Sequence, residues 1–112
     1  MHRDRAVELF HAVAAHHGEA WAPSGSPKFG ANALRVSGKI YAALTRKHHL
    51  LLKLPPVRIK ELLAAKRATR FESGGRVMNG WITLACDDEA EWVTLSDEAR
   101  TFVAAETKRK KR

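Results

Sequence analysis

The clearest signal in this sequence is a set of short segments in which apolar residues alternate with basic or aromatic ones. The alternation runs through 33–36 and 39–45, continues in 49–54 and returns in 80–85. Successive side chains of a β-strand point to opposite faces of the sheet, so each segment predicts a strand with one buried face. The spacing assigns to the buried face Leu34, Val36, Ile40, Leu50, Leu52, Leu54, Ile82 and Leu84. It assigns to the outer face Arg35, Lys39, Tyr41, Lys53, Trp81 and Thr83.

Three segments have the spacing of amphipathic helices instead. Residues 4–17 predict a helix that ends before Gly18, with an apolar stripe formed by Ala6, Leu9, Phe10 and Val13. Residues 57–67 predict a second helix, because proline suits the first helical position and Pro55-Pro56 precedes the segment. A third helix is expected from Asp87-Asp88-Glu89, burying Trp92, Leu95, Ala99, Phe102 and Val103.

The connections complete the predicted fold. Residues 22–27 are rich in proline, glycine and serine and predict a loop, and Ser37-Gly38 predicts a tight hairpin turn. Residues 70–80 contain three glycines and are interpreted as irregular. The resulting order is helix, three strands, helix, strand, helix. This order predicts a single compact α+β domain over 1–107, with an antiparallel sheet of about four or more strands flanked by N- and C-terminal helices.

Composition restricts the class of protein. The chain has 112 residues, enough for one domain with its own core. The single Cys86 excludes an internal disulfide and a multi-cysteine zinc site. No apolar run approaches the roughly 18 residues of a membrane-spanning helix, so neither a membrane segment nor a membrane partner is expected. A cytoplasmic location is the default prediction.

Charge points to a class of partner. The net charge is +8, a value that favours nucleic acid or other anionic partners. Five of these charges belong to the last five residues, which are Lys108, Arg109, Lys110, Lys111 and Arg112. The rest of the chain then carries a net charge of +3. This basic segment is predicted to be a disordered tail.

Several short motifs resemble a known group of proteins. The motifs are Lys28-Phe29-Gly30, Leu34-Arg35-Val36, Gly38-Lys39-Ile40-Tyr41-Ala42, Leu52-Lys53-Leu54-Pro55, Arg70-Phe71 and Gly75-Arg76-Val77-Met78-Asn79-Gly80-Trp81. They resemble the small bacterial YjbR/MmcQ proteins and the related N-terminal domain of TfoX/Sxy regulators, over nearly the whole chain. The resemblance implies a CyaY-like (frataxin-like) α+β domain of a kind often labelled DNA-binding, with no catalytic residues to carry over. Iron delivery in that fold uses an acidic ridge, which a basic chain with one small acidic cluster does not match.

The residues that could carry catalysis or metal binding form no recognised pattern. His16-His17 would lie about 100° apart on a helix and His48-His49 on opposite faces of a strand, so neither pair is expected to chelate a metal. The serines lack a nucleophile-elbow setting, and Cys86 follows no activating basic cluster. We therefore expect no enzyme activity, no metal and no cofactor.

The function predicted from these observations is a non-enzymatic bacterial regulatory module. It would bind DNA or RNA through the basic-aromatic sheet face and the tail, since bases stack on aromatic rings and basic side chains neutralise phosphates. The candidate contact residues are Arg35, Lys39, Tyr41, Lys53, Arg58, Lys60, Arg76, Trp81, Lys108, Arg109, Lys110, Lys111 and Arg112. Two alternatives stay open: Tyr41 and Trp81 pack beneath a helix, or the same face docks a protein partner.

Overall fold

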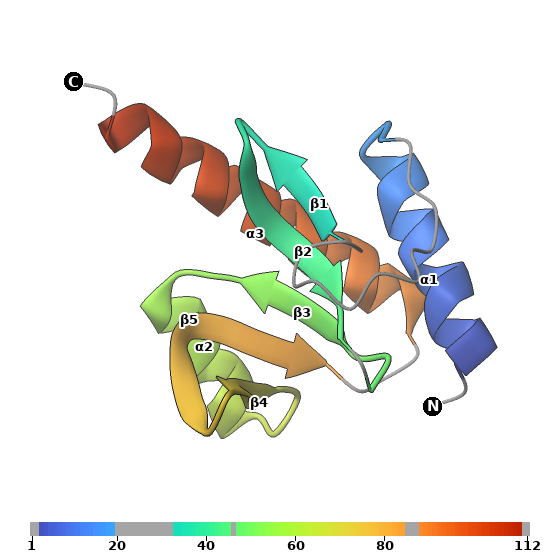
Figure 1. The fold of residues 1–112 in the computed structure, drawn as a ribbon, viewed down its shortest axis with the longest axis horizontal. Helices are drawn as coiled ribbons and strands as arrows, with labels where there is room; N and C mark the ends of the chain where they lie inside the picture. The colour runs from blue at the N-terminus through green and yellow to red at the C-terminus, as the bar shows by residue number, and fades with distance from the viewer. Residues whose placement is uncertain (1–2, 20–32, 46, 85–87, 111–112) are drawn as a thin grey trace.

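The fold is an α+β domain in which helices flank a five-stranded antiparallel sheet (Figure 1). The structure, a computed structural model, describes residues 3–19, 33–45, 47–84 and 88–110. Its elements are α1 (Arg3–His16), β1 (Ala33–Val36), β2 (Lys39–Leu44), β3 (Leu50–Lys53), α2 (Pro56–Ala64), β4 (Thr69–Ser73), β5 (Arg76–Leu84) and α3 (Glu89–Lys110). The predicted fold class is therefore confirmed, with one strand more than the sequence indicated.

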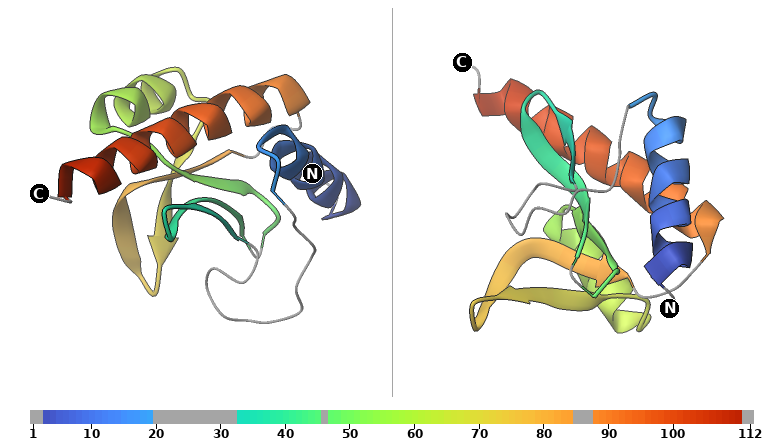
Figure 2. Two further views of the ribbon diagram at one scale, coloured as in Figure 1. Left: turned by 90° about the horizontal axis from the view of Figure 1, so that it is seen from above. Right: turned by 45° about the vertical axis from the view of Figure 1, so that its right-hand side comes forward.

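The sheet has the strand order β1-β2-β3-β5-β4, and its helices gather on one face. Figure 2 shows α3 and α2 on the same side of the strands, with α1 beside the first half of α3. Strand register brings apolar residues into line across the sheet: Ala42 pairs with Leu52, and Leu52 pairs with Ile82. These rows form the floor of the core.

The core joins this floor to the apolar stripes of the helices. Six residues predicted to be buried lie in one core cluster. They are Leu34 of β1, Leu50 and Leu52 of β3, Leu54 just after β3, and Ile82 and Leu84 of β5. The cluster also contains the predicted stripe of α1, including Phe10, and most of that of α3, including the fully buried Trp92, while Phe102 is half-buried against it. The periodicity of the sequence thus located most of the core.

Tyr41 departs from the predicted alternation. The register between β1 and β2 shifts between Leu34 and Arg35, which leaves Tyr41 as an extra residue on β2. Such a bulge turns its residue out of the regular alternation. Tyr41 consequently joins the core with no exposed surface, and Ile40 is absent from the core cluster. The predicted orientations of these two side chains are wrong, and the alternative of a packed Tyr41 is confirmed.

The segment that the sequence analysis interpreted as irregular is a β-hairpin. Ser73 pairs with Arg76, so Gly74 and Gly75 form a two-residue turn between β4 and β5. Both glycines have positive φ, 59° and 80°, as the type I′ turn that suits hairpins requires. A second irregularity lies near Gly80, whose φ is +91°, and β5 curves strongly in Figure 1. The glycines therefore shape a long hairpin.

Backbone conformation and capping define where α2 ends and where α3 begins. α2 ends at Ala64, three residues before its predicted end, because Lys66 adopts a left-handed conformation with φ of 59°. Asp88 Oδ1 accepts a hydrogen bond from the Glu91 backbone N–H at the start of α3, and Asp87 lies outside the described residues. The α3 backbone is helical to Lys110, including the first three residues of the basic segment. No helix within the described residues is long and apolar enough to span a membrane.

Candidate functional site

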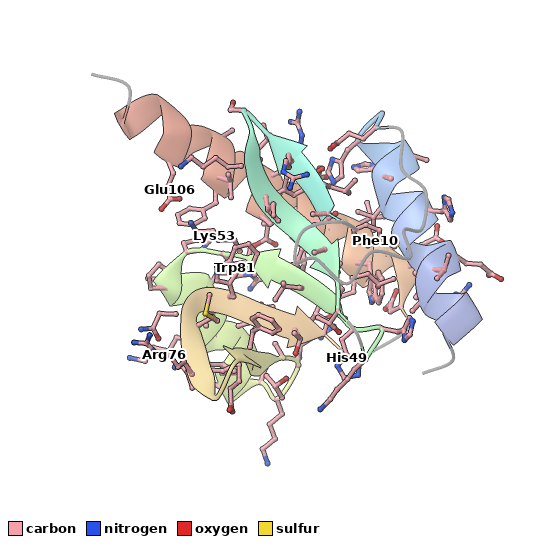
Figure 3. The ribbon with its side chains drawn as sticks, in the orientation of Figure 1. Phe10, His49, Lys53, Arg76, Trp81 and Glu106 are labelled. Carbon is pink, nitrogen blue, oxygen red and sulfur yellow. The ribbon has the colours of Figure 1, made fainter. Side chains whose placement is uncertain are left out.

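Part of the predicted basic-aromatic face is present where the last residue of β3 pairs with β5. Lys53 lies opposite Trp81 in the ladder, with its ammonium nitrogen 6.0 Å from the centre of the indole ring. Arg76 is exposed further back on β5, on the same side of the molecule as Lys53 and Trp81 in Figure 3. Glu106 of α3 reaches the same place and forms an ion pair of 3.4 Å with Lys53. Lys53 and Trp81 therefore form a basic-aromatic pair beside one carboxylate, and Arg76 lies exposed at the start of the same strand as Trp81.

The β1–β2 hairpin adds two further cations. Arg35 and Lys39 are both exposed and flank the Ser37-Gly38 turn. Their hairpin lies beside the C-terminal half of α3 in both Figure 1 and Figure 2. That half of α3 leads into the basic segment 108–112, whose side chains lie outside the description. The sheet edge therefore places Arg35 and Lys39 on a hairpin beside the C-terminal half of α3.

Other predicted contact residues lie elsewhere. Tyr41 is buried beneath the helices, and Arg58 donates to Glu98 and Glu61, with its Nε 2.8 Å from Glu98 Oε1. These carboxylates hold the pKa of Arg58 above its usual value. Lys60 is exposed on α2, in the helix layer. The structure brings Lys53 and Trp81 together, leaves Arg76, Arg35 and Lys39 exposed on the strands, and separates Tyr41, Arg58 and Lys60 from the Lys53–Trp81 pair.

A second polar site, which the sequence analysis missed, joins the end of α1 to the middle of α3. His16 Nε2 lies 3.0 Å from Asp97 Oδ2, and His17 Nδ1 lies 3.5 Å from Asp97 Oδ1. The opposite nitrogen of His17, Nε2, lies 3.0 Å from the Ser96 hydroxyl. His16 is the last residue of α1 and His17 belongs to the following turn, which is how both rings reach one carboxylate.

The same site continues to the sheet through Tyr41. Its hydroxyl donates a short hydrogen bond to the Glu19 carboxylate, and its ring meets His17 edge-on with centroids 5.5 Å apart. Burial raises the pKa of Tyr41, and the hydrogen bond to Glu19 raises it further, so the phenol stays protonated. Burial lowers the pKa of His17 despite the attraction of Asp97. A neutral imidazole is therefore favoured at position 17.

The Ser96, His17 and Asp97 side chains have the connectivity of a catalytic triad without its function. A triad serine must present its oxygen to a substrate. Ser96 has no exposed surface, and its hydroxyl donates to the Val93 backbone oxygen at 2.9 Å within α3. The buried Ser96 hydroxyl therefore orients the His17 ring and is not exposed as a nucleophile.

A groove between α2 and the start of α3 is a further concave feature of the described residues. Its apolar floor includes Leu62 and Leu95. The charged groups at its margin are held by one another, since Arg58 binds Glu98 and Arg67 binds Glu91. These ion pairs link α2 and the residues after it to α3. The charged groups around the groove therefore have a structural role.

Sequence reasoning missed the histidine site for a definite reason. It treated His16 and His17 as residues of a regular helix, where neighbouring side chains diverge, but the helix ends between them. Gly18, recognised as a stop signal, was the available clue. The partner residues lie about eighty positions further along the chain, and no local pattern indicates them.

Comparison with known proteins gave no match to a family model, a curated protein or a solved structure.

Proposed function

We propose that this protein is a nucleic-acid-binding module whose contact surface is the basic end formed by Lys53, Arg76 and Trp81. Arg35, Lys39 and the basic segment 108–112 would extend this surface. The observation that carries the proposal is the half-buried Trp81 with a lysine ammonium 6.0 Å from its ring and an exposed arginine on the same strand. An aromatic ring beside a cation suits a stacked base next to a phosphate.

The proposed mode of binding uses no base-specific readout. Stacking on Trp81 would contribute about 1–3 kcal/mol, and each phosphate neutralised by Lys or Arg releases counterions. Single-stranded DNA or RNA fits this mode, because its bases are free to stack. The proposal assigns no catalytic step, and the related suggestion of a bacterial regulatory role rests on the family resemblance alone.

Glu106 opposes this function in the free protein. Its carboxylate pairs with Lys53, whose side chain is 30% exposed, and adds a negative charge to the surface that would meet phosphates. A phosphate would have to replace Glu106 as the partner of Lys53. The ion pair should therefore weaken nucleic-acid binding, and removing the charge of Glu106 should strengthen it.

The test is fluorescence anisotropy with labelled single-stranded and duplex oligonucleotides at several salt concentrations. Lys53→Gln/Arg76→Gln should weaken binding and reduce the slope of log K against log salt by about 2 for the two lost phosphate contacts. Glu106→Gln should strengthen binding at low salt. Trp81→Leu should weaken single strands more than duplexes.

A charge-matched control separates specific contacts from the overall field. Lys47→Gln/Lys60→Gln removes the same charge from the far end of β3 and from α2, and should leave the salt slope nearly unchanged. Equal losses in both double variants would contradict the proposed surface. A version ending at Glu106 that lost all binding would assign the affinity to the basic segment alone.

Protein docking is the second candidate function, and two exposed apolar residues favour it. Val77 and Met78 on β5 are 47% and 37% exposed, beside the turn of the β4–β5 hairpin. Apolar docking there would release no counterions, so its affinity should change little with salt. Salt-insensitive binding of a partner that Met78→Lys abolishes would support this candidate over nucleic acid.

A further inference from the structure

The histidine site between α1 and α3 is the strongest unassigned chemistry in the described part of the chain. His16, His17 and Asp97 each offer one ligand atom, and these atoms all lie within 4.8 Å of one another. Within the described residues, no other group of three such side chains converges in this way. The His16 and Asp97 side chains are 43% and 55% exposed, which leaves a path for an ion from solvent.

Hydrogen bonding orients the buried member of this group. The Ser96 hydroxyl donates its hydrogen to the Val93 backbone oxygen, so toward His17 its oxygen acts as the acceptor. His17 therefore carries a hydrogen on Nε2, and in the neutral imidazole Nδ1 keeps a lone pair. Nδ1 faces Asp97 Oδ1 at 3.5 Å. This space between a ring nitrogen and a carboxylate oxygen suits a positively charged partner, either a proton on Nδ1 or a metal cation bound by both atoms.

We propose that His16, His17 and Asp97 bind a divalent transition-metal cation such as zinc, which would join the end of α1 to the middle of α3.

The donor set matches the chemistry of such an ion. Imidazole nitrogens and a carboxylate are ligands that zinc and its neighbours in the first transition row accept. A tetrahedral zinc ion with bonds of about 2.0–2.1 Å holds its ligand atoms about 3.4 Å apart. The His16 and His17 nitrogens lie 3.0 and 3.5 Å from the two different carboxylate oxygens of Asp97, distances close to this value. Small rotations of the two exposed side chains would complete the set.

Ser96 supplies the support that metal-binding histidines need. Such histidines usually donate their second ring N–H to a fixed acceptor, which sets the tautomer and the ring orientation. The buried Ser96 hydroxyl does this for His17. Three protein ligands leave at least one coordination position for water. This inference is independent of the nucleic-acid proposal, because it uses none of the same residues.

The experiment is calorimetric titration of the metal-stripped full-length protein with zinc chloride, repeated with cobalt chloride and monitored by visible absorption. His16→Gln and Asp97→Asn alter exposed side chains, so these variants should fold. Each is expected to weaken zinc binding by about tenfold or more, and Ser96→Ala by a similar factor. Zinc should also raise the melting temperature of the unaltered protein, since it binds the folded state.

The adjacent pair His48 and His49 provides the matched control. His48→Gln/His49→Gln removes two histidines outside the proposed site and should bind zinc as the unaltered protein does. The proposal fails if the unaltered protein binds no zinc. It also fails if His16→Gln and Asp97→Asn bind zinc as tightly as the unaltered protein, because the ion would then lie elsewhere.

Discussion

At the scale of single residues, Tyr41 shows how one side chain can belong to two environments. Its ring lies in the core, while its hydroxyl reaches the Glu19 carboxylate at the edge of that core. The fully buried Tyr41 hydroxyl needs such an acceptor, because an unsatisfied polar group in the interior is costly. Tyr41 thus links the packing of β2 to the polar site at the end of α1.

Removing only the hydroxyl tests this link. Tyr41→Phe keeps the ring but deprives Glu19 of its donor, so we expect a loss of about 1–2 kcal/mol in the free energy of unfolding. Urea denaturation of Tyr41→Phe, Glu19→Gln and the double variant would measure the coupling. If the two single changes were simply additive, the hydrogen bond would contribute no stability.

His49 gives a residue-scale prediction for pH. Burial lowers its pKa below the ordinary value of 6.5, and the charge of Lys47 lowers it further. The folded state therefore binds this proton more weakly than the unfolded state does. Its contribution to stability is complete above pH 6.5 and is lost as the pH falls through the lower, folded-state pKa.

The measurement is the urea midpoint as a function of pH. The midpoint should fall as the pH decreases from 7 toward 5, and His49→Gln should flatten that decrease. Parallel curves for the two proteins would show that another group causes the loss.

At the scale of elements, the C-terminus of α2 is closed by a lysine in a conformation that glycine prefers. Lys66 has φ of 59°, and the Arg67 and Lys66 amides bond back to Leu62 and Leu63. This is the hydrogen-bond pattern of a Schellman motif. A residue with a Cβ at this position carries a strain of about 1 kcal/mol.

Lys66→Gly should therefore stabilise the protein. We expect a gain of about 0.5–1 kcal/mol, because relief of strain outweighs the added freedom of the unfolded chain. Thermal and urea unfolding would measure it, with Lys66→Ala as the control that removes the charge and keeps the Cβ. An equal gain in Lys66→Ala would assign the effect to charge.

Elements also show what the sequence could reveal about the fold. The helices and the inner strands were predictable because their apolar spacing matches the period of each structure, as the buried stripe of α3 illustrates. β4 was missed because Arg70 and Glu72 lack apolar alternation, and because the three glycines of 70–80 favour irregular structure. The bulge at Tyr41 was invisible, since a register shift depends on the facing strand.

At the scale of the whole molecule, the sequence could predict the basic composition of the candidate site but not how its residues are arranged in space. The basic surplus was evident, but the ion pairs that hold Arg58 and Lys53 come from carboxylates of a distant helix. The convergence of His16, His17 and Asp97 likewise depends on the packing of the first helix against the last. Local spacing carries no information about such contacts, so three-dimensional structure was required.

The packing of α1 against α3 has a consequence for synthesis of the protein. α1 is made first and its main helical partner is made last. As the chain leaves the ribosome, the apolar side chains of Leu9 and Phe10 stay exposed to solvent until α3 has emerged. Completion of the core is therefore delayed until α3 has been synthesised, which lengthens the time during which apolar surface is exposed.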